Sequence, residues 1–390
     1  MTMRRMRWEI FCQVIDNHGD LGVSLRLARD LAARGDTVRL WVDDASALAW
    51  MAPELAGAPA GAPLQLADWP ASTGQAVLQA LRQAPADVLV ETFGCNPPAS
   101  FVDAWSQGHA ARAAAGYDAR GVWINLEYLS AEGFAERQHG LESPVSSTPA
   151  VRKFFYHPGF SAATGGLLRE PALLALQQQW QRAALRRQWG AQDDEWLLSL
   201  FCYEPDALPD WLAALAAPAA DRPVRLLVTP GRAAAAVASA QRVLDRDQPR
   251  WNESGRLRLQ PLPWLSQDGY DQLLWACDCN FVRGEDSLVR ALWAGRPWIW
   301  QLYPQAGDAH HAKLQAMLGW ADQAVAPAPA AWRALMLRWN GLAAPHGTTG
   351  AMPGMAAVAG WEPWVRRLRA HLLAQSDLGS ALRGFVLMKR

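Results

Sequence analysis

Residues 280–301 read NFVRGEDSLVRALWAGRPWIWQ, and this pattern predicts a strand, a tight polar loop, a helix and a second strand. We expect the first strand at 280–282 and the loop at 283–287. Gly295 and Pro297 stand where a helix C-cap and a stop are expected, and the second strand follows them. The pattern is typical of an open α/β sheet, which binds ligands at the carboxyl ends of its strands.

The polar loop in this stretch is a candidate binding site for a diphosphate. A helix N-terminus offers unpaired N–H groups to an anion, and Arg283 adds a cation before Gly284. The carboxylate of Glu285 is suited instead to accept hydrogen bonds from sugar hydroxyls. The alternative is that the loop only caps a helix, through Asp286 or Ser287.

The composition limits the class of protein. A chain of 390 residues is long enough for two domains, and 37 Lys and Arg balance 37 Asp and Glu. That balance argues against a direct nucleic-acid partner, which would need a basic surplus. Five scattered cysteines indicate reduced thiols and a cytoplasmic protein. We see no signal peptide and no apolar run near the ~20 residues that span a bilayer, so we expect no membrane partner.

The first half of the chain opens with a strand, a loop, a helix and another strand. Residues 8–14 alternate between apolar and polar side chains, residues 15–22 read IDNHGDLG, and Gly35 ends the helix that follows. Residues 37–42 form the next strand, so we expect a parallel sheet. The loop lacks G-x-G-x-x-G, so the dinucleotide fingerprint is absent.

The loop after the first strand carries two carboxylates, Asp16 and Asp20, with Asn17, His18 and Gly19 between them. Two carboxylates at the end of a strand suit a cationic ligand or acid–base chemistry. The alternative is that Asp20 or Asn17 is simply the helix N-cap.

Two further carboxylates, Glu91 and Glu127, also end predicted buried strands. If the sheet is parallel, they lie on the same edge as Asp16 and Asp20. Four carboxylates on one edge are energetically unfavourable unless a cation balances their charge, because like charges raise one another's pKa. We therefore expect a cationic ligand at this edge.

The second half begins a new α/β series. Aromatic residues at its strand ends, Phe201, Tyr203 and Trp264, are candidates for stacking a base, with core packing as the alternative. The D-x-D sequence at 245–247 lies in a charged helix tail, which we interpret as surface. His310-His311 indicates a helix start rather than a metal pair, so we expect no metal.

Together these motifs resemble the EarP family of bacterial protein-arginine rhamnosyltransferases, which modify an arginine of translation elongation factor P. The resemblance covers about residues 8–373. It rests on DNHGDLGVSLRLARDLA, ETFGC, WINLEYLSAE, LFCYE and FVRGEDS-x-x-RA-x-WAGRP-x-x-W.

The resemblance implies an α/β protein with the GT-B glycosyltransferase fold, in which two Rossmann-like domains face each other across a cleft. We expect an acceptor domain at 1–187, with a C-terminal helix at 364–390 packing back on it, and a donor domain at 188–363. It also implies a dTDP-β-L-rhamnose donor, inversion at the anomeric carbon and no metal cofactor.

The family's motifs also assign roles to individual residues. Asp20 matches the proposed general base, with Asp16 beside it as the second catalytic aspartate. The candidates on the acceptor side are Asn17, His18, Gly19, Glu91 and Glu127. The predicted donor-binding residues are Phe201, Tyr203, Trp264, Gln267, Arg283, Gly284, Glu285, Asp286 and Ser287. An arginine acceptor agrees with the acidic edge, because a guanidinium is always charged and needs carboxylates to hold it.

Two alternatives remain. A GT-B enzyme with a small-molecule or lipid acceptor predicts an apolar or basic acceptor edge. A non-catalytic module that binds a sugar nucleotide predicts that Asp20 is dispensable.

Overall fold

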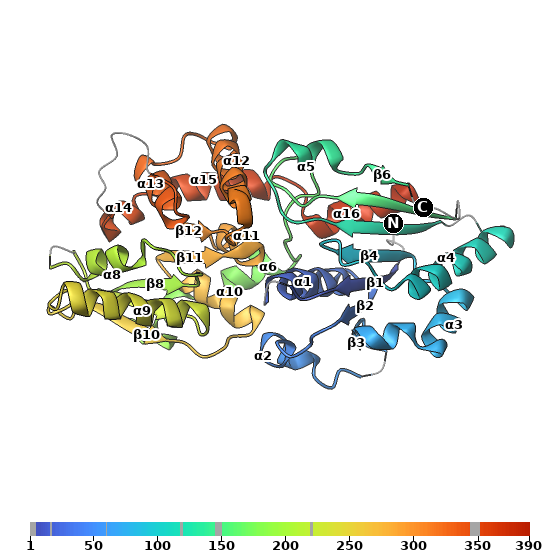
Figure 1. Ribbon diagram of the computed structural model, residues 1–390, viewed down its shortest axis with the longest axis horizontal. Helices are drawn as coiled ribbons and strands as arrows, with labels where there is room; N and C mark the ends of the chain where they lie inside the picture. Colours follow the sequence, from blue (N-terminus) through green and yellow to red (C-terminus); the bar gives the residue numbers. More distant parts are fainter. Residues whose placement is uncertain are drawn as a thin grey trace. The chain divides into compact units, whose positions relative to one another are not determined.

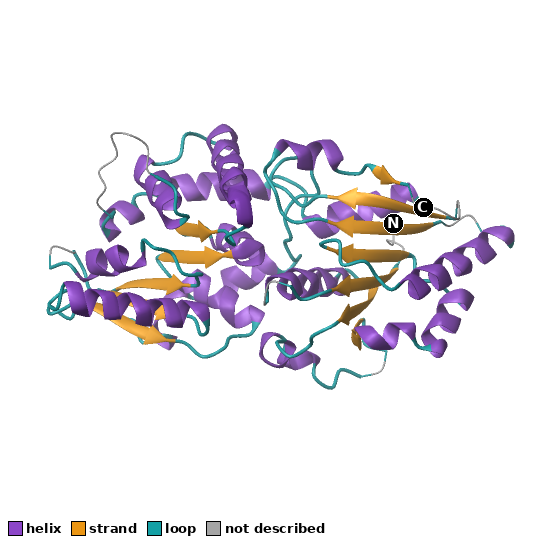
Figure 2. Cartoon of the chain, viewed as in Figure 1, coloured by secondary structure: helices purple, strands orange, loops and turns teal. Residues whose placement is uncertain are grey.

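The computed structural model describes residues 5–15, 18–59, 61–117, 120–144, 150–218, 221–343 and 352–390. The chain forms two compact units: unit 1 is Met1–Leu173 with Gln375–Arg390, and unit 2 is Leu174–Ala374. The strands of each unit lie side by side, flanked by helices (Figures 1 and 2).

Unit 1 is built on a sheet with the strand order β3-β2-β1-β4-β5-β7-β6. All neighbours are parallel except β6 and β7. The strands are β1 (Arg7–Cys12), β2 (Thr37–Val42), β3 (Leu64–Asp68), β4 (Val88–Thr92), β5 (Gly121–Leu126), β6 (Glu142–Ser143) and β7 (Val151–Tyr156). The helices are α1 (Gly19–Ala33), α2 (Leu48–Met51), α3 (Gln75–Gln83), α4 (Ala99–Ala114), α5 (Gly133–Gln138) and α16 (Leu378–Lys389), with short 3₁₀ turns at Pro53–Leu55 and Trp69–Thr73.

The core of unit 1 follows from the alternation of its strands. One face of the sheet buries Ile10, Val90 and Ile124 with apolar residues of α1 and α16. The other buries Phe11 and Leu89 against α3 and α4. A parallel sheet that is covered on both faces needs strands that are apolar on both sides, and β1 and β4 satisfy this requirement.

Unit 2 has five parallel strands in the order β10-β9-β8-β11-β12. They are β8 (Trp196–Leu200), β9 (Val224–Val228), β10 (Leu257–Pro261), β11 (Cys279–Arg283) and β12 (Trp298–Gln301). The helices are α6 (Leu173–Gln179), α7 (Arg182–Gln188), α8 (Leu208–Ala216), α9 (Arg232–Asp247), α10 (Gln267–Ala276), α11 (Gly284–Ala294), α12 (Ala309–Ala324), α13 (Ala330–Trp339), α14 (Met355–Ala359) and α15 (Glu362–Leu373), with a 3₁₀ turn at Ala306–Asp308.

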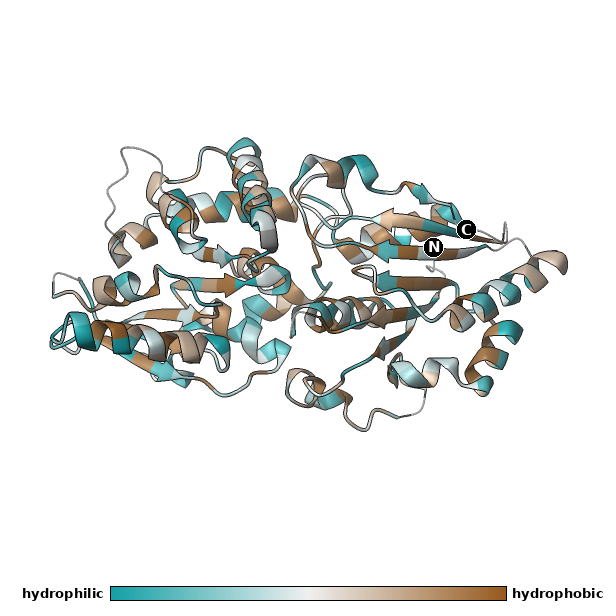
Figure 3. Cartoon of the chain, viewed as in Figure 1, coloured by the Kyte–Doolittle hydropathy of each residue, from teal (hydrophilic) through white to brown (hydrophobic). Residues whose placement is uncertain are grey.

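Helix α9 shows how sequence pattern sets burial in unit 2. It buries Ala233, Val237, Ala240 and Leu244, which recur every three or four residues and share one face. The helix accordingly shows both apolar and polar bands in Figure 3. The D-x-D sequence at 245–247 lies at its exposed end, where Arg246 pairs with Asp247, as the surface interpretation predicted.

The stretch at 280–301 folds largely as predicted, with one difference. Strand β11, helix α11 and strand β12 follow in order, and Gly295 ends α11 in the left-handed conformation with φ 68°. The predicted polar loop at 283–287 does not form, because α11 begins at Gly284, directly after β11. Glu285 and Asp286 therefore lie in the first helical turn, where acidic side chains interact favourably with the helix dipole.

The units divide at 173/174 and 374/375, whereas the sequence analysis placed the boundaries at 187/188 and 363/364. Of the predicted C-terminal helix at 364–390, only α16 belongs to unit 1, and α15 belongs to unit 2. The helical pattern runs through both segments, so it did not reveal the change of unit between them.

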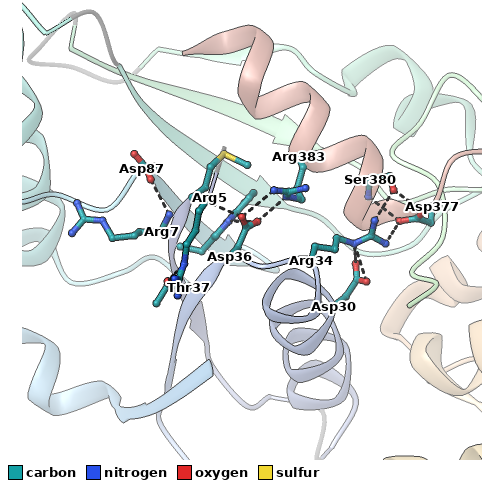
Figure 4. Close-up of polar contacts among 12 residues, drawn as sticks. Arg5, Arg7, Asp30, Arg34, Asp36, Thr37, Asp87, Asp377, Ser380 and Arg383 are labelled. Atoms are coloured by element: carbon teal, nitrogen blue, oxygen red, sulfur yellow. Dashed lines mark hydrogen bonds and ion pairs between the residues drawn. The ribbon is translucent and has the colours of Figure 1, made fainter. Parts of the chain in front are cut away.

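One buried and two partly buried ion pairs hold α16 in unit 1 (Figure 4). Arg383, 3 % exposed, donates from Nε and Nη2 to the two carboxylate oxygens of Asp36, at 2.8 and 3.0 Å. Arg34 donates to Asp377 at 2.6 Å, and Arg390 donates to Asp87 at 2.6 Å. The last helix is thus tied to the N-terminal sheet through charged groups far away in sequence.

Candidate functional site

Both sheets reverse their strand order at one point. The reversal lies between β1 and β4 in unit 1 and between β8 and β11 in unit 2. In open α/β sheets, ligands bind outside the carboxyl ends of the strands at such a reversal. Most of the predicted site residues follow these strands or the next strand along the sheet.

Asp20 lies in the first turn of α1, just after β1, and is 3 % exposed. The backbone N–H of Ile15 donates to its Oδ2 at 3.1 Å, and the hydroxyl of Tyr128 donates to its Oδ1 at 3.4 Å. Residue 18, not Asp20, occupies the N-cap position of α1. Asp20 is therefore not the N-cap, and neutral donors hold both of its oxygens in a fixed orientation.

The structure describes only two of the other predicted residues of this loop, His18 and Gly19. Asp16 and Asn17 lie outside the described residues. His18 is the N-cap residue, and its ring makes an edge contact with Trp50 at 5.1 Å between centroids. Gly19 is the first residue of α1.

Glu91 is the next-to-last residue of β4 and Glu127 follows the neighbouring β5, so both lie near the carboxyl ends of these strands, but each has a partner within unit 1. Lys153 on β7 lies 2.5 Å from Glu91, whose side chain is 2 % exposed. Asn125 donates to Glu127 at 2.7 Å. Burial raises the pKa of Glu127, the bond from Asn125 opposes this shift, and the charge of Glu91 adds to it. The expected cation for Glu91 is thus a lysine of the protein itself.

The cysteines beside these residues are not reactive. All five are free and buried. Burial raises the pKa of the Cys12 thiol to about 12, and the pKa values of Cys95 and Cys202 also reach about 12 for the same reason. These three stay protonated near neutral pH, and a thiol is a poor nucleophile and metal ligand.

In unit 2 the start of α11 is shaped by Gly284, which has φ 65°. An L-residue is strained in this conformation, and a Cβ here would lie 3.7 Å from the Tyr203 hydroxyl. The N–H of Arg283 donates to the Ser287 hydroxyl at 3.1 Å, and that hydroxyl donates back to the Arg283 carbonyl. Ser287 therefore stabilises the turn.

Arg283 is fixed by aromatic rings. Its guanidinium lies 4.4 Å from the ring centre of Phe201 and 4.5 Å from that of Tyr203, and Nη1 donates to the Cys202 carbonyl at 3.1 Å. Cation–π contacts of this kind hold a cation without neutralising its charge. Tyr203 is 1 % exposed and lies against the guanidinium groups of Arg283 and Arg232, and its stacking on a base stays a prediction.

The remaining predicted residues of unit 2 follow β10 or lie in the first turn of α11. Trp264 is 49 % exposed and is the predicted stacking residue with an accessible ring. Gln267 begins α10 and is 5 % exposed. Glu285 forms an ion pair with Lys313 of α12, and Asp286 lies beside it in the first turn of α11.

Several other residues of these sites were not predicted from the sequence. Arg232 begins α9 after Gly231, pairs with Glu204, and lies over Tyr203 at 4.7 Å and Tyr303 at 6.0 Å. Like Arg283, it joins a strand to a helix next to a glycine, and that pattern could have identified it. Tyr128 comes directly after Glu127 beyond β5, so the strand-end pattern could have identified it. Lys153 and Lys313 had no comparable signal, because only tertiary contacts bring them to the site.

One group of three side chains in the described part of the chain could hold a metal ion. Ligand atoms of Asp308, His310 and His311 lie within 4.8 Å of one another. His310 Nδ1 already accepts from the N–H of Gln305 at 3.2 Å, and His311 Nε2 lies 3.0 Å from the Asn340 carbonyl. The two histidines open helix α12, as predicted. No helix among the described residues is long and apolar enough to cross a membrane.

Comparison with known proteins supports the predicted family. The model of the elongation factor P (EF-P) rhamnosyltransferase EarP matches residues 8–387. A protein-arginine rhamnosyltransferase of Pseudomonas putida is 44 % identical over 354 residues, which cover 85 % of this chain and 86 % of that protein. A protein-arginine rhamnosyltransferase of Pseudomonas aeruginosa is 42 % identical over 328 residues, which cover 80 % of each chain.

Solved structures agree. A structure that describes EarP-mediated arginine glycosylation of EF-P superposes with a TM-score of 0.60 at 30 % identity, covering 99 % of this chain and 100 % of that one. A glycosyltransferase from Rickettsia africae has a TM-score of 0.51 at 8 % identity, covering 99 % of this chain and 98 % of that one, and shows the fold alone. With the two parallel sheets, these matches confirm the GT-B class.

Proposed function

Because the chain belongs to the EarP family of protein-arginine rhamnosyltransferases, we propose that it transfers L-rhamnose from dTDP-β-L-rhamnose to an arginine of translation elongation factor P. The acceptor is a translation factor, so we expect the reaction in the cytoplasm. The observation that supports this chemistry best is Asp20, a buried carboxylate held by neutral donors after β1. An ionised carboxylate in this position can attract a guanidinium and accept its proton.

In the proposed reaction, a guanidinium nitrogen attacks the anomeric carbon from the face opposite the diphosphate. The N–C bond forms as the bond from carbon to the diphosphate oxygen breaks, and that oxygen keeps the electron pair. Asp20 takes the proton that the nitrogen loses, and attack from the opposite face gives inversion. Asp16, four residues earlier, is proposed to help hold the guanidinium.

Unit 2 is proposed to stabilise the departing diphosphate. Arg283 is a charged group fixed by Phe201 and by Tyr203, and α11 begins directly after it, where the positive end of the helix dipole favours an anion. Preorganised donors of this kind need no rearrangement as negative charge develops. Trp264 is proposed to stack on the thymine base, and Glu285 to accept from a sugar hydroxyl.

The function is tested by the intact mass of elongation factor P after incubation with this protein and dTDP-rhamnose. We expect a gain of one deoxyhexose, and none when the target arginine is replaced by lysine. An unchanged mass of the unmodified factor, with both proteins folded, would refute the proposal.

Arg283→Ala and Glu285→Ala are expected to weaken binding of dTDP-rhamnose. Removing a charged hydrogen-bonding partner costs about 1.5–3 kcal/mol, which is roughly a 10- to 100-fold loss of affinity. Calorimetry measures it directly. Arg246→Ala is the matched control, because Arg246 lies at the exposed end of α9. Unchanged affinity in both folded variants would show that the start of α11 does not bind the donor.

Exhaustive chelation is expected to leave transfer at its full rate, because Arg283 and the start of α11 are proposed to do the work of a metal ion. The assay compares rates before and after chelation with EDTA. Loss of activity that magnesium or manganese restores would contradict this, and the group formed by Asp308, His310 and His311 would then be the first to replace.

A further inference from the structure

Tyr128 touches the proposed base and takes no direct part in the proposed transfer. It follows β5, at the carboxyl end of the sheet, and its side chain is 41 % exposed. Its hydroxyl donates to Oδ1 of Asp20 at 3.4 Å. Its ring stacks on Phe93, with 4.3 Å between centroids and 15° between the planes.

Phe93 is held in an unusual backbone conformation. It follows β4 directly and has φ 57°, a left-handed value that bulky residues rarely adopt. Its N–H donates to the Leu126 carbonyl at 2.7 Å, which continues the pairing of β4 with β5 by one residue. Strain of this kind persists only where the surroundings impose it, and it is common at functional sites.

These contacts form a chain from the sheet to the carboxylate. The strained Phe93 supports the ring of Tyr128, and the hydroxyl of Tyr128 reaches Asp20. The Ile15 N–H holds the other oxygen of Asp20 at 3.1 Å. Two donors on two oxygens fix the plane of the carboxylate, and a base works best when its lone pair is already aligned with the proton it removes.

We propose that Tyr128 is a positioning residue for Asp20, with Phe93 as the support that orients its ring. The proposal rests on the proposed role of Asp20 as the base. The motifs ETFGC and WINLEYLSAE, at 91–95 and 123–132, thus meet at one carboxylate, through Phe93 from the first and Tyr128 from the second.

Other titratable groups also face this region. Cys12 ends β1. The negative charges of Asp20 and of Asp43, which follows β2, add to the rise in the pKa of its thiol. Cys12 stays protonated, because burial raises its pKa to about 12. His18 precedes α1, and Glu127 lies next to Tyr128 in the chain. Removing the Tyr128 hydroxyl leaves all of these groups in place.

The test is Tyr128→Phe, which keeps the ring on Phe93 and removes only the hydroxyl. We expect kcat to fall about 10-fold, with the KM for elongation factor P and the affinity for the donor within about twofold of wild type. A hydrogen bond to the charged form stabilises that form, so its loss makes Asp20 easier to protonate. The acid limb of the pH–rate profile is therefore expected to move up by about half a unit.

Two further variants act as controls. Tyr117→Phe removes the hydroxyl of another exposed tyrosine of unit 1, one that packs on Arg112, and is expected to leave the rate and pH profile unchanged. Phe93→Ala removes the support of the ring and is expected to give a shift in the same direction as Tyr128→Phe. Combined with Tyr128→Phe it should move the acid limb no further, because both changes act on one bond.

A measurement that needs no activity separates this inference from the proposed function. Carboxyl ¹³C NMR of aspartate-labelled protein, with Asp20→Asn to assign the signal, gives the titration midpoint of Asp20. We expect a higher midpoint in Tyr128→Phe than in wild type. An unchanged midpoint overturns the inference whether or not the protein transfers rhamnose. A raised KM with unchanged kcat also overturns it, because Tyr128 would then bind the acceptor rather than position the base.

Discussion

Replacing Asp20 with Asn is expected to lower the rate of rhamnosyl transfer about 10²- to 10⁴-fold, the usual cost of losing a general base. An asparagine can still accept from the Ile15 N–H and remain beside the Tyr128 hydroxyl, so the fold around α1 should be kept. It cannot take a proton from the guanidinium. Donor affinity should be unchanged, because the residues proposed to bind the donor belong to unit 2.

The rate is measured as the time course of mass gain on elongation factor P, and donor affinity by calorimetry. Asp103→Asn is the matched control, because it removes an exposed carboxylate from α4 of the same unit and should leave the rate unchanged. If folded Asp20→Asn protein turned over at a near-normal rate, Asp20 would only stabilise the loop before α1. If the protein were a non-catalytic binding module, Asp20 would also be dispensable, but the wild-type protein would then show no transfer.

Replacing Asp36 with Ala is expected to destabilise unit 1 by about 3–5 kcal/mol, the usual cost of breaking a buried ion pair. Asp36 is fully buried and accepts from the Met6 N–H and the Trp8 indole, each at 3.0 Å, as well as from Arg383. The substitution leaves these donors without their acceptor and a guanidinium buried without its counter-ion. The position of α16 on the sheet depends on the same contacts (Figure 4).

Calorimetric unfolding of the full chain measures this loss. The two units need not unfold in one transition, and calorimetry can resolve the transition of unit 1 from that of unit 2. Glu142→Ala is the matched control in unit 1: it breaks the more exposed pair with Arg152 and should cost at most about 1 kcal/mol. Arg383→Met should be similarly destabilising, and combined with Asp36→Ala it should cost less than the sum of the two. Equal, small losses for Asp36→Ala and Glu142→Ala would show that the Arg383 pair does not secure α16.

The sequence by itself determined the elements of the fold and the family. Apolar alternation and helical spacing are properties of neighbouring residues, so they located β11, α11 and β12 within 280–301 and β2 at Thr37–Val42. Motifs placed Asp20 after the first strand and Arg283 after the strand of the opening stretch, because a parallel sheet puts such positions at one edge. Within 280–301 the start of α11 was misplaced, since a glycine with positive φ let the helix begin without a loop.

The tertiary structure decided what each of these side chains contacts. Lys153 neutralises Glu91, the rings of Phe201 and Tyr203 hold Arg283, and Tyr128 reaches Asp20 from 108 positions away in the chain. Arg383 pairs with Asp36 across 347 positions and assigns α16 to unit 1. Periodicity relates residues only a few positions apart, whereas these partners are set by the order of strands in the sheets and by the return of the chain to unit 1. The sequence shows which residues are charged or aromatic, but only the folded structure shows which of these side chains contact one another.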